Sequence, residues 1–121
     1  MPVRTVLVVD DSPTDRQYLI DMLVRNGYHV SAAESVEEGL LKARQLKPDL
    51  VLMDVVMPGQ NGFQATRALT RDDATKHIPV ILCTSKGQET DKVWGLRQGA
   101  RDYIVKPVNQ AELLVKISKL G

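Results

Sequence analysis

Residues 50–54 read Leu-Val-Leu-Met-Asp, and this stretch decides the fold. It is preceded by Pro48 and followed by Pro58-Gly59. A short apolar run between such turn residues is typical of a strand that is buried on both faces of a parallel sheet. Asp54 ends the run, and open α/β sheets place their chemistry at the carboxyl ends of their strands. Taken alone, Asp54 could equally be a turn residue before Pro58.

Working outward, strand-like runs alternate with helical patterns along the whole chain. Ser12-Pro13 is typical of a helix start, as a cap residue followed by proline at the first helical position. Ser35 with Glu38, and Asn109 with Glu112, have the spacing of a capping box. The patterns predict strands over 5–9, 29–32, 50–54, 78–83 and 102–105. They predict helices from about 13 to just before Gly27, from 35 to Pro48, from 62 to Arg71, from 88 to Gln98, and from 109 to near Leu120.

Such regular alternation predicts right-handed βαβ units with helices on both faces of the sheet. The expected fold is α/β and flavodoxin-like: a doubly wound, five-stranded parallel sheet in the order 2-1-3-4-5, with five helices. In that order the first and third strands lie side by side at the switch point. These strands end in Asp10-Asp11 and Asp54, so the sequence predicts that the three carboxylates meet.

Composition narrows the possible functions. The chain has 121 residues, a net charge of +1 and no run of basic residues, which gives nucleic-acid binding little support. No apolar stretch approaches the ~20 residues of a membrane span, and no signal peptide is visible. The single Cys83 favours a reducing cytoplasm. We therefore expect one cytoplasmic domain over 1–121, with no residues left over for a second domain.

The predicted site has the composition of a phosphoryl-transfer centre. Three carboxylates in a partly desolvated place repel one another, and a bound cation relieves that repulsion. An oxygen-only cluster suits Mg²⁺, with Mn²⁺ as a possible substitute. Lys106 and Thr84 end the fifth and fourth strands and bring a positive charge and a hydroxyl to the same rim. These groups suit transfer of a phosphoryl group to Asp54.

Two other functions share this fold class. A flavodoxin-like electron carrier would need a Ser/Thr/Gly-rich phosphate loop after the first strand, where this chain has Asp10-Asp11. A phosphatase with an aspartyl nucleophile would usually want a second acid two residues after Asp54, where this chain has Val56. Both alternatives are therefore less favoured by the residues at the strand ends.

The same residues carry a family resemblance. They are Asp10-Asp11, Asp54 followed by Met57-Pro58-Gly59, Thr84, and Tyr103 with Lys106-Pro107. In this order and spacing they resemble the receiver domains of bacterial two-component response regulators, of the stand-alone CheY kind, over the whole chain. The stretches 58–67 and 88–103 look closer to PilH-type regulators of twitching motility.

The resemblance implies a role for each matching residue. Asp54 would accept the phosphoryl group from a CheA-like histidine kinase. Asp11, Asp54 and the carbonyl of Val56 would ligate Mg²⁺, and Asp10 would assist through water. Lys106 and Thr84 would contact the phosphoryl oxygens, while Thr84 and Tyr103 would form the switch. The Lys106-Pro107 bond is expected to be cis.

The resemblance also implies how the signal would leave the domain. The protein would be a single receiver domain over 1–121 with no output domain of its own, and it would not be an enzyme in its own right. A monomer would signal through a protein partner. That partner would bind the face built from the fourth helix, fifth strand and fifth helix, in twitching or chemotaxis-like control. The resemblance places Val56 and Lys86 on either side of the line along which water would attack the phosphoryl group. Because neither side chain is suited to activate that water, we expect slow loss of the phosphoryl group.

Apart from the resemblance, the residues themselves predict that Cys83 is buried and that His29 and His77 are surface or hydrogen-bonded histidines rather than ligands. Trp94 is expected to pack at a helix edge, with a contact for a partner as the alternative.

Overall fold

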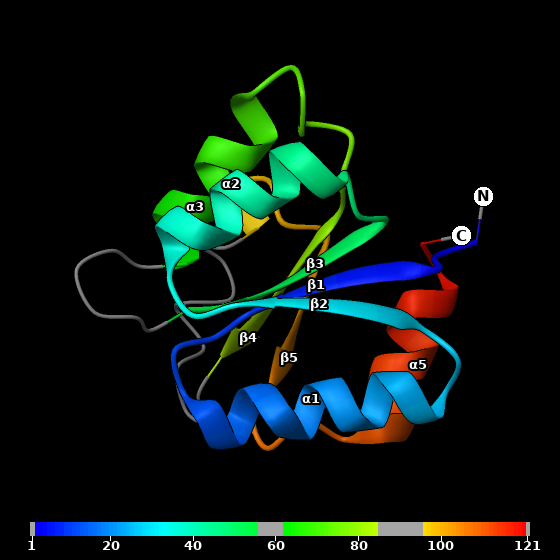
Figure 1. Cartoon of the computed structure of the whole chain (residues 1–121). Coiled ribbons are helices and arrows are strands. Elements are labelled where there is room, and N and C mark those ends of the chain that lie inside the picture. The colour runs from blue at the N-terminus through cyan, green and yellow to red at the C-terminus, as the bar shows by residue number, and fades with distance from the viewer. Residues whose placement is uncertain (1, 56–61, 85–95, 121) are drawn as a thin grey trace.

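The computed structural model describes residues 2–55, 62–84 and 96–120. Strands and helices alternate in this part of the chain, as the sequence predicted (Figure 1). Most of the predicted fourth helix, 88–98, lies outside the described residues. The described elements are β1 (Thr5–Val9), α1 (Pro13–Arg25), β2 (His29–Ala33), α2 (Val36–Leu46), β3 (Leu50–Asp54), α3 (Gly62–Arg71), β4 (Val80–Thr84), β5 (Asp102–Val105) and α5 (Gln110–Ser118).

The five strands form one parallel sheet in the order β2-β1-β3-β4-β5, so the predicted α/β class and strand order are confirmed. β1 pairs with β3 from Val6–Leu50 to Val9–Met53, and β3 pairs with β4 as far as Asp54–Cys83. This register brings the carboxyl ends of β1, β3 and β4 to one edge of the sheet.

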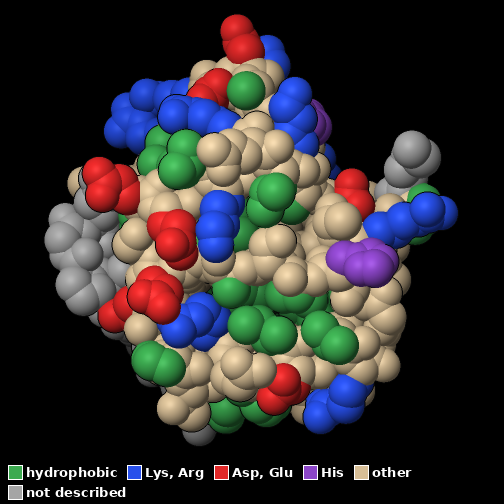
Figure 2. All heavy atoms as spheres, in the orientation of Figure 1, with side chains coloured by type: hydrophobic (Ala, Val, Ile, Leu, Met, Phe, Trp, Pro, Cys, Tyr) green, Lys and Arg blue, Asp and Glu red, His purple; other side chains and the backbone are tan. Residues whose placement is uncertain are grey.

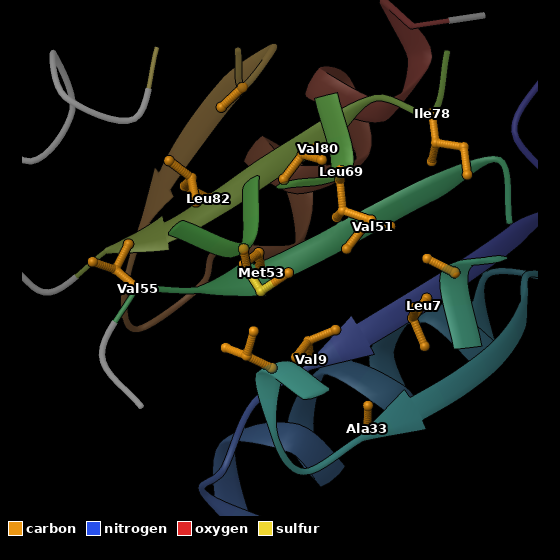
Figure 3. Packing of buried hydrophobic residues seen from close by; sticks show 14 residues of the cluster. Leu7, Val9, Ala33, Val51, Met53, Val55, Leu69, Ile78, Val80 and Leu82 are labelled. Atoms are coloured by element: carbon orange, nitrogen blue, oxygen red, sulfur yellow. The ribbon is translucent and has the colours of Figure 1, made fainter. Parts of the chain in front are cut away.

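Two hydrophobic layers hold the sheet between its helices (Figure 1). Alternate strand residues point to opposite faces, because side chains alternate along a strand. Figure 3 shows one layer, in which Leu7, Val51 and Leu82 from three strands belong to the same buried cluster as Leu69 of α3. In the other layer, Leu52 and Ile81 pack with Leu23 of α1 and Leu113 of α5. The all-apolar strands therefore bury both faces, as expected for a parallel sheet.

The edge strand β2 is the least buried of the five strands. Its residues are exposed or partly buried until Ala33, as the more polar sequence predicted. Figure 2 shows hydrophobic side chains at the surface between α1 and α2, where β2 runs. Across the sheet, β4 begins at Val80, two residues later than predicted, because Ile78 and Pro79 belong to the preceding turn.

Side-chain caps fix where the helices begin. Ser12, Ser35 and Asn109 each accept a hydrogen bond from the backbone N–H three residues on, as their sequence patterns predicted. The Glu38 carboxylate accepts from the N–H of Glu34, one residue before the Ser35 cap. None of the helices described in this structure has the length and hydrophobicity needed to cross a bilayer.

Candidate phosphoacceptor site

Four strand ends converge at one edge of the sheet. Asp10 directly follows β1, Asp54 ends β3, Thr84 ends β4 and Lys106 directly follows β5. Asp10, Asp11 and Asp54 each bring a carboxylate oxygen to within 4.8 Å of the other two. The Nζ atom of Lys106 lies 3.1 Å from Asp54 Oδ1 and 2.9 Å from Asp10 Oδ2. The four residues that the sequence singled out at these strand ends therefore form one cluster with Asp11.

Asp54 lies in an environment that disfavours its charge. Its side chain is buried, and that burial, together with the negative charge of Asp10, raises the pKa of Asp54 to about 6. The positive charge of Lys106 opposes this rise but does not cancel it. Within the protein alone, Lys106 therefore does not fully offset the negative charge of the three carboxylates.

The donor set fits a small divalent cation. Asp10, Asp11 and Asp54 offer only carboxylate oxygens, and Asp11 is the most exposed of the three. Hard cations such as Mg²⁺ take oxygen ligands and keep several waters, so a site with one solvent-facing side suits them. A cation here would also offset the charge repulsion that raises the pKa of Asp54.

Lys106 is held by three carboxylates. Its ammonium lies 3.0 Å from Asp15 Oδ2 of α1, in addition to its contacts with Asp10 and Asp54. Burial alone would lower the pKa of Lys106, but the hydrogen bonds to Asp10 and Asp15 and the charge of Asp54 outweigh burial and raise the pKa. Lys106 therefore remains charged at neutral pH. The Lys106-Pro107 bond is cis, as expected.

Thr84 is placed beside Lys106 by the backbone. The N–H of Lys106 donates to the carbonyl oxygen of Thr84 at 2.7 Å. The Thr84 side chain is fully buried, and its Oγ1 has no hydrogen-bond partner within the described part of the chain. A buried hydroxyl without a partner is costly, and such groups need an explanation. An oxygen-rich group bound at the acid cluster is one partner that this hydroxyl could take.

Tyr103 lies on the strand next to Thr84. In the β4–β5 register, Tyr103 pairs with Leu82 and Thr84 pairs with Val105, so the two side chains are diagonal neighbours on one face of the sheet. Tyr103 is half-buried and packs against the hydrophobic layer that contains Leu82. The Nζ atom of Lys116 in α5 lies 5.3 Å from the centre of its ring.

The sequence analysis missed two contacts at this site. Asp15 was not singled out, although it stands three residues after the Ser12 cap, where a short acid faces the end of the neighbouring strands. Arg16 was also missed, and its Nη1 donates to the carbonyl oxygen of Asp10 at 2.8 Å. Residues Val56, Lys86 and Trp94, which the sequence analysis did single out, lie outside the described residues.

The remaining expectations concern side chains away from the acid cluster. Cys83 is buried and unpaired, and burial raises the pKa of its thiol to about 12, so it is a hydrophobic core residue. His29 and His77 are exposed, as predicted.

The sequence was also compared with protein families and with known proteins. The model of the response regulator receiver domain family matches residues 6–118. The chain is 59% identical to the protein PilH of Pseudomonas aeruginosa over 113 residues, which is 93% of each chain. It is 39% identical to the phosphate regulon transcriptional regulatory protein PhoB of the same species, but it spans only 50% of that longer protein.

Solved structures agree with the sequence relatives. The chemotaxis protein CheY4 of Vibrio cholerae superposes with a TM-score of 0.90 at 32% identity, over 98% of this chain and 99% of the other. The predicted likeness to CheY-like and PilH-type regulators is confirmed at the level of family. On the match over 6–118 and the identity to PilH, this chain belongs to the response regulator receiver domain family.

Proposed function

We propose that this chain is a phosphorylation switch in which Asp54 accepts a phosphoryl group from a histidine kinase. Asp10, Asp11 and Asp54, with the carbonyl of Val56, would hold Mg²⁺. The observation that carries the proposal is the meeting of four charged side chains from three strand ends: three carboxylates within 4.8 Å, with the Lys106 ammonium 3.1 Å from Asp54. Membership of the receiver family supports the same function.

The side chains have complementary parts in the transfer. An oxygen of Asp54 attacks the phosphorus atom, the bond from phosphorus to the donor nitrogen breaks, and the donor imidazole keeps that electron pair and takes a proton. Positioning and charge neutralisation are most of what such a reaction needs. Lys106 supplies a fixed positive charge beside Asp54, and the Thr84 hydroxyl, otherwise unpartnered in the described chain, donates to a phosphoryl oxygen. Bound Mg²⁺ supplies further positive charge for the carboxylates and the incoming group.

The output is proposed to pass through the strand next to Thr84. Movement of Thr84 toward the phosphoryl group would change the space beside its diagonal neighbour Tyr103. Tyr103 in turn lies against Lys116 of α5, a helix that exposes Val115. A protein partner would bind this side of the molecule, the described part of the expected face of fourth helix, β5 and α5.

The biological setting is proposed from the relatives. Identity of 59% to PilH favours control of type IV pilus twitching or a chemotaxis-like system, with a CheA-like kinase as donor. The chain would act in the cytoplasm as a monomer and would catalyse only its own phosphorylation and dephosphorylation. A flavodoxin-like electron carrier is disfavoured, because carboxylates occupy the place where a phosphate loop would be needed.

Labelling with acetyl phosphate tests the proposal. Intact-mass spectrometry of the protein with acetyl phosphate and Mg²⁺ should show the addition of one phosphoryl group, and removal of Mg²⁺ by a chelator should abolish it. Asp54→Asn should not be labelled. Asp73→Asn is the matched control, because Asp73 is an exposed acid that pairs with Lys76 on the surface. Stable labelling of Asp54→Asn would overturn the assignment of Asp54.

A further inference from the structure

The third partner of Lys106 stands apart from the acid cluster. Asp10 and Asp54 are buried and belong to the group of three carboxylates that could hold a cation. Asp15 does not belong to that group among the described residues, and its side chain is 49% exposed. Its Oδ2 nevertheless lies 3.0 Å from the Lys106 ammonium, as close as the oxygens of Asp10 and Asp54. Asp15 therefore contacts the lysine from the solvent side.

The first turn of α1 fixes Asp15 in this place. Its N–H donates to the Oγ of the cap residue Ser12 at 3.3 Å. Ser12 in turn donates its N–H to Oδ1 of Asp10 at 2.9 Å, so the helix start is tied to the acid cluster. An acid in a first helical turn is favoured by the helix dipole, and that preference alone needs no partner. Asp15 has a partner, 91 residues away in the chain.

Lys106 donates hydrogen bonds to Asp10 and Asp15 and forms an ion pair with Asp54. An ammonium has three N–H donors and no acceptor, and Lys106 has three carboxylates at 2.9, 3.0 and 3.1 Å. Under the proposed function, a cation would draw on Asp10 and Asp54, and Asp54 would carry the phosphoryl group. Asp15 is the one partner that these events leave unchanged.

We propose that Asp15 is a positioning residue that holds the Lys106 ammonium at the rim of the acid cluster before and during phosphoryl transfer. The inference rests on the proposed function for the transfer step. Without Asp15, the flexible lysine side chain would spend more time turned toward solvent and less time beside Asp54. Because Asp15 is half-exposed, water and salt screen the pair, and its loss should cost about two- to fivefold in rate.

The test compares Asp15→Asn with a matched control. Glu37→Gln also removes one negative charge from the first turn of a helix, in α2, and Glu37 is not among the carboxylates that contact Lys106. With acetyl phosphate well below saturation and Mg²⁺ saturating, Asp15→Asn should label about two- to fivefold more slowly than wild type. Glu37→Gln should label at the wild-type rate, and Asp15→Glu should recover most of the loss.

A second readout needs neither metal nor phosphate. Lysine-selective NMR of the metal-free protein should show a shifted Lys106 ammonium signal in Asp15→Asn and an unshifted one in Glu37→Gln. The signal is assigned by its loss in Lys106→Arg. A purely structural role for Asp15 would lower thermal stability without moving this signal.

The outcomes separate the two proposals. A wild-type protein that acetyl phosphate does not label contradicts the proposed function, and the NMR comparison then still decides whether Asp15 holds Lys106. Labelled wild type with an equal or faster rate in Asp15→Asn overturns the positioning role. An unshifted Lys106 signal in Asp15→Asn overturns it as well.

Discussion

At the scale of one residue, the Thr84 hydroxyl, which has no hydrogen-bond partner among the described residues, predicts an unusual mutational result. An unsatisfied buried polar group costs about 1–3 kcal/mol, and replacing it by an apolar group of the same shape can be stabilising. Thr84→Val should therefore raise the free energy of unfolding of the metal-free, unphosphorylated protein, by about 1 kcal/mol. Urea denaturation measures this change.

Thr75→Val is the matched control for this prediction. Thr75 is as deeply buried as Thr84, but its Oγ1 donates to the carbonyl oxygen of Leu69 at 2.7 Å. Its replacement should lower the free energy of unfolding by about 1 kcal/mol, the typical worth of one hydrogen bond. Equal destabilisation by the two substitutions would show that the Thr84 hydroxyl has a bonding partner in solution.

At the same scale, some residues of the site could be predicted from the sequence and one could not. Asp10, Asp54, Thr84 and Lys106 were predictable, because each ends or follows an apolar strand and parallel strands bring such ends together. Asp15 was not, because its contact with Lys106 depends on the angle at which α1 leaves the sheet. Sequence patterns describe faces and ends of elements, whereas this contact depends on how two elements are packed.

At the scale of the element, the start of α3 is packed against the end of β3. The N–H of Gly62 donates to the carbonyl oxygen of Val55 at 2.9 Å. A Cβ atom on Gly62 would lie 2.9 Å from Val55 Cα and closer still to the carbonyl oxygen of Asp54, so backbone would have to move. Only glycine fits this approach, and it directly adjoins the proposed phosphoacceptor.

Gly62→Ala should therefore affect both stability and chemistry. Overpacking of this kind costs about 1–3 kcal/mol, and the shifted Asp54 backbone should slow labelling by acetyl phosphate. Urea denaturation and labelling rates measure the two effects on the same protein preparation.

Gly27→Ala, just after the C-terminal end of α1, is the control for this prediction. Gly27 has φ +89°, and no atom of the described residues lies within 4 Å of an added Cβ. Alanine there is therefore strained by about 1–2 kcal/mol without a clash with the described part of the chain. It should lose stability and keep the wild-type labelling rate. A Gly62→Ala protein that also labelled at the wild-type rate would contradict the link between α3 packing and Asp54.

Element boundaries show where sequence prediction reaches its limit. The caps at Ser12, Ser35 and Asn109 were predicted correctly, because a cap bond is local and joins residues three apart. The start of β4 was predicted two residues early, because the apolar Ile78 reads as strand. Ile78 is buried in the core from the preceding turn, where its N–H bonds to Thr75. Hydrophobicity reports burial, and burial does not require a strand.

At the scale of the whole molecule, the acid cluster should reduce the stability of the metal-free protein. The pKa of Asp54 is raised from an unfolded value near 3.8 to about 6. A raised pKa means that the stability contributed by the protonated carboxyl is fully present below about pH 3.8 and is lost as pH rises through about 6. Above that range the protein is folded around a charge that it disfavours.

Asp54→Asn should therefore stabilise the metal-free protein at pH 7 and have little effect at pH 4. The difference in free energy of unfolding should grow between these values to about 1–3 kcal/mol, since one pKa unit corresponds to about 1.4 kcal/mol. Urea denaturation in the presence of a chelator, at several pH values, measures it.

Asp49→Asn supplies a control of opposite sign. The N–H groups of Arg4 and Thr5 donate to the Asp49 carboxylate and hold its pKa below the usual value. Its stabilising contribution is present above the unfolded pKa and is lost as pH falls. Asp49→Asn should therefore be less stable than wild type at pH 7 and approach it in acid.

Mg²⁺ should abolish most of the gap between wild type and Asp54→Asn. A ligand that binds the native state alone raises stability in proportion to RT ln(1 + [L]/Kd). Wild type has the complete set of three carboxylates, so it should gain more from Mg²⁺ at pH 7 than Asp54→Asn does. Equal gains in the two proteins would mean that Asp54 contributes nothing to binding Mg²⁺. A gap that does not change with pH in the metal-free state would mean that the charge of Asp54 is already balanced in the native fold, so that repulsion in the acid cluster would provide no driving force for binding a cation.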